Sequence, residues 1–215
     1  MSIRTAACPN CGAAVVFRWS AAVQTTCDYC RAILVRHDVA LEKVGVVGDL
    51  PVDPSPIQRG TMGHWGARTF EVVGRIMYEY GRGYWNEWHL RFSDGESGWL
   101  SDAQLEYAVS VLVAPEHAIP AEDELHVGDA LVHGGARYQV TTMTTARYRG
   151  VEGELPFEYW DKEETLFADL RASSRRFAAI DYSEQPPLLF VGEHVAFADL
   201  GLRELREFEG WPRPA

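Results

Sequence analysis

Four cysteines near the N-terminus form two Cys-x-x-Cys pairs, and the chain has no others. Cys8 and Cys11 make the first pair, and Cys27 and Cys30 make the second after fifteen intervening residues. In each pair a tight turn brings two thiolates to one ion, and Gly12 relieves the turn after Cys11. Two pairs at this spacing predict a zinc ribbon. Because four thiolates leave no open coordination position, structural zinc is favoured over catalytic or redox use.

Arginines lie close to the cysteines in sequence: Arg4, Arg18 and Arg31. Four thiolates on one Zn²⁺ leave a net charge of about −2. These arginines can balance that charge or contact nucleic acid, and charge balance is the favoured interpretation.

Carboxylates between Gly150 and Asp181 form a second group of residues that could carry out chemistry. The strongest catalytic candidates are Glu152, Glu154, Asp169 and Asp181. Paired carboxylates can act as general acid and base or hold a hard metal ion. They follow no fixed motif spacing, however, and alternating charge usually marks a solvated face. Catalytic motifs such as His-Glu-x-x-His, Gly-x-Ser-x-Gly and the P-loop are missing, so the sequence favours a non-enzyme.

Two stretches of the chain resemble each other at a fixed offset of 68 residues. The first begins at Ile57 and the second at Leu125. The matched pairs are Ile57 with Leu125, Gly60 with Gly128, Phe70 with Tyr138, Val72 with Val140, and Tyr80 with Tyr148. Such similarity indicates one structural unit used twice.

The repeated stretches alternate with period two, which is typical of strands. Residues 70–80 are expected to form a half-buried strand, and Ser93–Glu96 a tight hairpin turn. Between them, Trp88 and Phe92 are expected to point inward. The opposite face is then expected to point outward; it comprises Trp85, Glu87, His89 and Arg91.

A dense aromatic cluster surrounds this strand. Core packing is its favoured role, because aromatic side chains dominate burial in small β domains. Exposed Trp and Tyr also mark interaction surfaces. Tyr84 and Trp85 are therefore the candidates for contact with a partner protein.

The predicted fold is mainly β, with an N-terminal zinc ribbon followed by two related antiparallel units, either small barrels or bent sheets. The predicted boundaries are 1–44 for the ribbon, 55–113 for the first unit and 123–209 for the second. Segments rich in Gly and Pro, 45–56 and 114–124, separate them. Residues 199–209 have apolar residues at three-residue steps and predict a short C-terminal helix.

Composition predicts a soluble cytoplasmic protein. The chain has 215 residues, of which 47% are hydrophobic and 24% charged. No apolar run approaches the roughly 20 residues of a membrane-spanning helix, and the first residues lack the apolar core of a signal peptide. Membrane insertion is therefore not expected. In the cytoplasm, paired cysteines more often bind metal than form disulfides.

Net charge predicts that the protein does not bind nucleic acid strongly. The chain carries −11 overall, from 20 basic and 31 acidic side chains. Residues 51–215 hold 15 basic and 27 acidic groups, or −12, and so repel phosphate backbones. We expect only weak, unspecific binding in a gel-shift assay at physiological salt. Sub-micromolar binding there would contradict this expectation.

Several motifs together resemble the bacterial domain-of-unknown-function 4178 family. They are the ribbon, the Ser-Pro linker, Gly-x-x-Gly-x-x-Phe-x-Val-x-Gly-Arg, Tyr-Trp-Asn-Glu-Trp, Asp-Gly-x-x-Gly-Trp-Leu and Gly-Glu-Leu-Pro-Phe. The resemblance covers nearly the whole chain and brings no assigned activity. It implies an accessory role in an envelope-stress-linked system.

The sequence thus favours a non-catalytic, zinc-containing adaptor or scaffold that acts through a protein partner. A hydrolase-like or metal-assisted enzyme using the acidic residues of the second unit is the first alternative. Weak nucleic-acid binding through the ribbon is the second.

Overall fold

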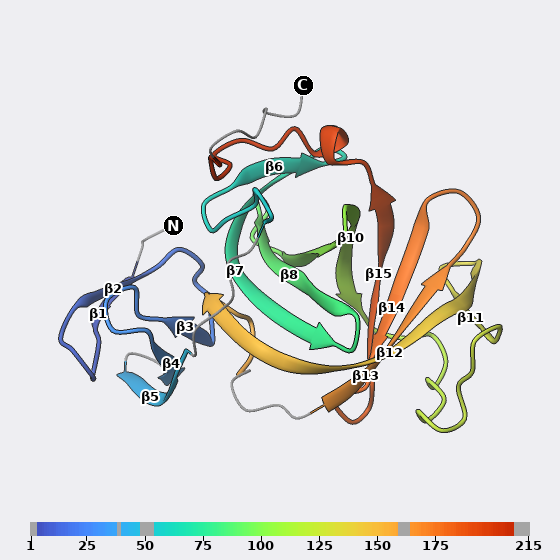
Figure 1. The fold of residues 1–215 in the computed structure, drawn as a ribbon, viewed down its shortest axis with the longest axis horizontal. Helices are drawn as coiled ribbons and strands as arrows, with labels where there is room; N and C mark the ends of the chain where they lie inside the picture. Colours follow the sequence, from blue (N-terminus) through green and yellow to red (C-terminus); the bar gives the residue numbers. More distant parts are fainter. Residues whose placement is uncertain (1–3, 38–39, 48–53, 159–163, 209–215) are drawn as a thin grey trace.

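The computed structural model describes residues 4–37, 40–47, 54–158 and 164–208. Within them the chain is mainly antiparallel β structure, with one turn of 3-10 helix (Figure 1). The mainly β prediction is confirmed.

The N-terminal segment forms two small sheets, at the left of Figure 1. One pairs β1 with β2, and the other has the order β3-β4-β5. The strands are β1 (Arg4–Ala7), β2 (Ala14–Phe17), β3 (Gln24–Thr26), β4 (Ala32–His37) and β5 (Ala40–Val46). This arrangement places each Cys-x-x-Cys pair in a turn, after β1 and after β3.

The remaining strands form a single ten-stranded sheet. They are β6 (Met62–Trp65), β7 (Arg68–Tyr80), β8 (Gly83–Phe92), β9 (Ser97–Ala103), β10 (Glu106–Val113), β11 (Ala130–His133), β12 (Ala136–Gly153), β13 (Glu164–Arg171), β14 (Arg176–Asp181) and β15 (Leu188–Val195). Their order is β11-β12-β13-β14-β15-β10-β9-β8-β7-β6, and β12 also pairs with β7. This extra pairing closes eight of the strands into a ring, with β6 and β11 outside it.

The two stretches related by the 68-residue offset contribute five consecutive strands each, β6 to β10 and β11 to β15. A β-bulge interrupts β7 between Val72 and Gly74, and another interrupts β12 between Val140 and Thr142. The halves meet at two seams, β7 with β12 and β10 with β15. They therefore share one sheet.

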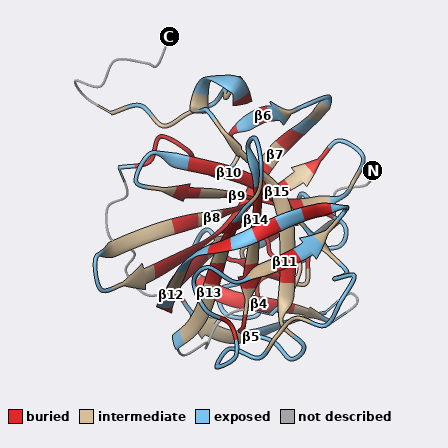
Figure 2. Cartoon of the chain, turned by 90° about the vertical axis from the view of Figure 1, so that its right-hand side faces the viewer, coloured by how far each residue is buried: buried red, intermediate tan, exposed pale blue. Residues whose placement is uncertain are grey.

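Both faces of β7 are covered over most of its length, so the expectation of a half-buried strand at 70–80 is wrong. On β7, Arg75 is 2% exposed and Met77 0%, although they lie opposite Ile76, which is 2% exposed. Figure 2 shows buried residues along β8, β9 and β10. The face of β8 expected to point outward is also enclosed, since His89 is fully buried. Alternation gives the two faces of a strand, but ring closure and covering segments decide how much solvent each face meets.

The C-terminal helix expected at 199–209 is replaced by one 3-10 turn, η1 (Phe197–Leu200). Gly201 adopts a left-handed conformation with φ of 52° and ends that turn. Beyond it, the backbone N–H of Arg203 donates to the carbonyl of Met62. Leu202 and Leu205 pack against the core of the first half. The three-residue spacing of the leucines thus reflects an irregular segment, with Glu204 at φ of 58°, that packs on the core of the first half; Glu209 lies outside the described residues.

Trp88 and Trp85 differ in burial along the same strand. Trp88 is 0% exposed, whereas Trp85 is half-buried. Replacing Trp88 with alanine is expected to destabilise the protein by about 3–5 kcal/mol, the usual cost of removing a core aromatic. Trp85→Ala is expected to cost about 1–2 kcal/mol. Urea unfolding of both variants measures the difference, and equal losses would contradict it.

Candidate functional site

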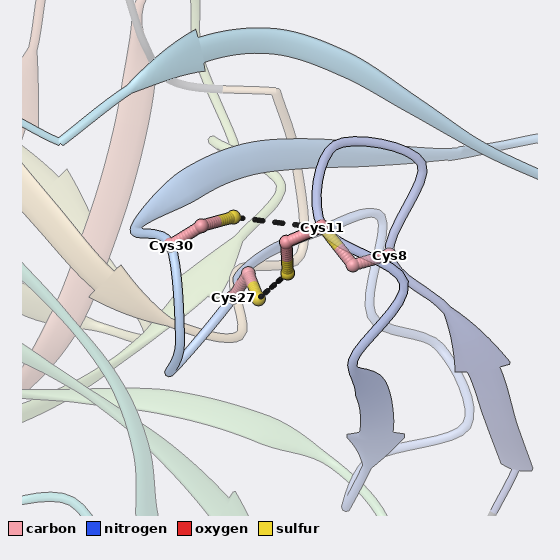
Figure 3. A group of neighbouring side chains, drawn as sticks. All are labelled: Cys8, Cys11, Cys27 and Cys30. Carbon is pink, nitrogen blue, oxygen red and sulfur yellow. Dashed lines mark hydrogen bonds between the residues drawn. The ribbon is translucent and has the colours of Figure 1, made fainter.

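The four cysteine side chains converge from two turns of the N-terminal segment (Figure 3). Their Sγ atoms all lie within 4.8 Å of one another. Cys8 Sγ is 3.7 Å from Cys30 Sγ, and Cys11 Sγ is 3.7 Å from Cys27 Sγ. These separations are too long for disulfides and agree with the edge of a tetrahedron whose centre is about 2.3 Å from each sulfur. The site therefore fits one metal ion.

Both cysteine turns have the same backbone design. The N–H of Gly12 donates to the Cys8 carbonyl at 2.8 Å, and the N–H of Arg31 donates to the Cys27 carbonyl at 2.9 Å. Gly12 has φ of 76° and Arg31 has φ of 58°. The left-handed residue after each pair reverses the chain, so that the pair's two sulfurs face the same point. The spacing of the cysteines thus follows from the geometry of the turn.

The ribbon is fastened to the ring through Glu154, one of the sequence-predicted catalytic candidates. Glu154 is 3% exposed. Its carboxylate accepts the backbone N–H of Arg18 at 2.6 Å and that of Trp19 at 2.7 Å. Burial raises its pKa, against the effect of these two donors. Glu154 therefore acts in this structure as a docking group for the ribbon.

Trp19 and His89 continue this contact between ribbon and ring. Their rings meet edge to face at a centroid distance of 5.0 Å. Burial lowers the pKa of His89 to about 4, so the imidazole is neutral. Because the Glu154 carbonyl only accepts, His89 Nδ1 donates to it at 2.7 Å, and Nε2 accepts from the Ser97 hydroxyl at 2.8 Å. Both ring nitrogens of His89 thus make hydrogen bonds within the protein.

Main-chain hydrogen bonds and a shared core complete the attachment. The N–H groups of Val23 and Gln24 donate to the Leu155 carbonyl at 3.0 and 3.2 Å, and the Leu155 N–H donates back to Gln24 at 2.9 Å. Ile33 of β4 packs in one core with Leu155 and Ile76. The ribbon, expected to be a separate small domain, has a buried cluster of its own around Phe17 and Leu34 and is joined to the ring's core through Ile33.

A cavity of about 840 Å³ lies inside the ring. All eight ring strands contribute to its walls. Its apolar part is formed by Tyr80, Trp85, Tyr107, Met143, Phe167 and Phe177, and its polar part includes Glu87, Ser101, Asp169, His194 and four threonines of β12. Ligand sites commonly have this size and this mixture of apolar walls with a few polar groups.

Trp85 forms the centre of the aromatic wall. It stacks on Tyr78 at a centroid distance of 5.0 Å and meets Phe167 edge to face at 5.5 Å. Its indole N–H donates to Glu87 Oε1 at 2.9 Å. The residue chosen from the sequence as a partner contact therefore faces the cavity; its neighbour Tyr84 is not among the residues that line the cavity.

Two carboxyl groups of the cavity have unusual acidities. Burial raises the pKa of Glu87 to about 8, against hydrogen bonds from Ser101 and Trp85, and the charges of Asp169 and Asp181 add to the rise. Burial likewise raises the pKa of Asp169 to about 6. At neutral pH, Glu87 is therefore mostly protonated and Asp169 mostly ionised.

The four sequence-predicted acidic candidates do not form one cluster. Glu152 lies 3.6 Å from Arg75 in an ion pair, and Glu154 holds the ribbon. Asp169 lines the cavity, and Asp181 influences Glu87 from β14. Sequence reasoning missed Glu87, because its place among the polar residues of β8 indicated a solvated face. Only the closure of the ring shows that this face looks inward.

The raised pKa values of Glu87 and Asp169 predict a pH-dependent stability. The pKa of Glu87 is about 8 in the folded state, whereas the ordinary pKa of a glutamate carboxyl is 4.5. Between these values the folded state binds more protons than the unfolded state, so stability falls as pH rises, by up to about 1.4 kcal/mol per pH unit. Asp169 adds the same sign below about pH 6. Glu87→Gln is expected to flatten the fall between pH 6 and 8 in urea unfolding.

Glu164→Gln is the matched control, because Glu164 is exposed. A wild-type protein with constant stability across this window would contradict the assignment.

Residues 58–197 match the model of a protein family described as "Domain of unknown function (DUF4178)". This match spans both halves of the ring and leaves out the ribbon. No curated protein and no solved structure matches the chain. In the part of the chain that the structure describes, no helix has the length and apolar character needed to cross a membrane.

Proposed function

The chain belongs to the domain-of-unknown-function 4178 family, and we propose that it is a non-catalytic, zinc-containing protein whose ring cavity binds a small molecule. The single observation that supports this most is the cavity of about 840 Å³ walled by all eight ring strands. An interior of this size in a closed sheet is enough to hold one small ligand.

Zinc is the metal that the ribbon's donor set favours. Four thiolates select zinc or iron among the common metals, and tetrahedral sulfur sites of this spacing are typical of structural zinc. The cluster has no position for a substrate, so the metal would stabilise the ribbon and, through Glu154, its attachment to the ring. The proposal places the protein in the reducing cytoplasm, where thiols stay available for metal.

The test uses native mass spectrometry and a cavity-filling variant. We expect the protein, incubated with a small-molecule extract of cells, to retain a ligand that Ala179→Phe excludes. Ala179 lines the cavity, so the larger side chain takes the ligand's space. Ala121→Phe, at an exposed position that does not line the cavity, is the control and should retain the ligand. Equal retention by wild type and Ala179→Phe would overturn the proposal, as would retention by neither.

An enzyme is the second candidate, and the acidities of Glu87 and Asp169 favour it. A protonated carboxyl beside an ionised one is a common acid and base arrangement. The prediction that separates it from binding alone is turnover: the ligand recovered from the cavity would be chemically changed on incubation with wild type and unchanged with Glu87→Gln.

An adaptor role through a protein partner is compatible with ligand binding. Leu105 is 81% exposed, and its neighbour Gln104 lines the cavity and donates to Tyr80 Oη at 2.7 Å. A partner that contacts Leu105, and Tyr84 and Trp85 nearby in the fold, would then sense the occupied cavity. Loss of cross-linking to that partner in Leu105→Ser tests this role. The described residues hold no feature specific to the envelope, so the proposal does not include that system.

A further inference from the structure

We propose that the ring cavity is selective for a small organic cation, a protonated alkylamine, whose ammonium group pairs with Asp169 while its hydrocarbon part packs against Trp85 and Phe167. The inference rests on the proposed function, since it names the class of ligand that the cavity would take.

Asp169 is the first observation behind this selectivity. Its side chain is half-buried and lines the cavity. Among the described residues its carboxylate has no hydrogen bond or ion pair, and only the backbone carbonyl of Asp169 is used, by Thr141. A carboxylate in such a place is costly unless a positive partner neutralises it. A ligand cation would supply that partner.

The other charged groups of the cavity leave this negative charge in place. The charge of Arg171 lowers the pKa of Asp169, against the effect of burial, but the Arg171 guanidinium pairs with Glu106 Oε2 at 3.1 Å and makes no hydrogen bond to Asp169. Arg82 is exposed in the turn between β7 and β8, and burial lowers the pKa of His194, which keeps it neutral. Among the described residues that line the cavity, no buried cation is left to pair with an anionic ligand, whereas the Asp169 carboxylate has no hydrogen bond or ion pair and can receive a cation.

The walls suit the rest of such a ligand. Thr142 is the cross-strand neighbour of Asp169 in the β12–β13 register, and its hydroxyl can accept a second ammonium hydrogen. The aromatic wall of Trp85 and Phe167 offers apolar surface and ring faces, and cations are attracted to such faces. Glu87, held by Ser101 and Trp85, adds a further acceptor oxygen.

The experiment compares three probes of nearly equal size and different charge: n-pentylammonium, 1-pentanol and pentanoate. Ligand-observed NMR titration of the full-length wild type is expected to show at least ten-fold tighter binding of the amine than of either other probe. Asp169→Asn should weaken amine binding by ten-fold or more and leave pentanol binding unchanged. Asp123→Asn, at an exposed acid, is the matched control and should bind all three like wild type.

Thermal unfolding of each variant checks the fold. Asn is close to isosteric with Asp and removes an unpaired charge, so Asp169→Asn should not be less stable than wild type. If it is, Thr142→Val provides a second test, with an expected loss of amine affinity of a few-fold and pentanol binding unchanged.

The outcomes separate the two proposals. If pentanoate or pentanol binds as tightly as the amine and Ala179→Phe excludes it, the cation class is overturned while ligand binding stands. If Asp169→Asn binds the amine as tightly as wild type does, the proposal of a cationic ligand is likewise overturned while ligand binding stands. If no probe binds and no cellular ligand is retained, both proposals fail.

Discussion

Replacing Cys27 with serine is expected to release the metal and to unfold the ribbon. Three thiolates hold Zn²⁺ far less tightly than four, and structural zinc contributes apparent free energies of roughly 10–16 kcal/mol in small domains. A segment of this length cannot bury enough apolar surface to fold unaided. Metal analysis and hydrogen exchange of Cys27→Ser should show loss of the metal and of amide protection throughout β1 to β5.

The same change should reach the ring through the docking contacts. Without the ribbon, Glu154 loses both backbone donors and Leu155 loses its exchange of hydrogen bonds with Gln24. Protection should therefore fall at residues 153–155 and persist in β13 and β14, whose core lies in the second half. Ser20→Ala, on an exposed ribbon position, is the control. A variant that keeps stoichiometric metal, or one whose residues 153–155 stay protected, would contradict this account.

Gly192→Ala is expected to destabilise the ring by more than about 4 kcal/mol, among the largest effects of a single methyl group. A Cβ at Gly192 would overlap the carbonyl oxygen of Val109 on the facing strand. Backbone cannot move aside as a flexible side chain can, so the β10–β15 seam would have to separate.

Gly81 provides a matched comparison. Gly81 lies in the turn between β7 and β8, two strands of the ring, yet a Cβ there meets nothing within 4 Å. Gly81→Ala should change stability by less than about 0.5 kcal/mol. Chemical unfolding of the two variants measures the contrast. Near-equal stabilities would show that the seam can open to admit a methyl group.

Patterns within short stretches of sequence correctly predicted the turns and strands that depend on neighbouring residues. The cysteine spacing predicted the four-cysteine cluster, because the turn in each pair needs only a few consecutive residues. Alternation predicted β7 and β8, and the Asp94-Gly95 pair predicted the turn between β8 and β9. In each case the informative pattern is carried by a short stretch of sequence, although the two cysteine pairs that come together are 16 to 22 residues apart.

The same patterns could not predict which residues far apart in the sequence come into contact. The bulge after Val72 exchanges the faces of β7, and no residue type marks it in advance. The pairing of Tyr107 with Val195 closes the ring and turns the polar face of β8 into a cavity wall. Glu154 was a catalytic candidate because it is acidic, but its partners Arg18 and Trp19 lie more than a hundred positions earlier.

Ring closure also constrains the order in which the protein can fold. β10 is synthesised long before β15, its partner across the second seam, and the two pair residues such as Tyr107 and Val195. Contacts this distant in sequence require a large loop to close first, and they slow folding. During translation, at roughly 5–20 residues per second, β10 has an unpaired edge until β15 has left the ribosome. The first half is therefore most prone to aggregation in the seconds before the last strand arrives.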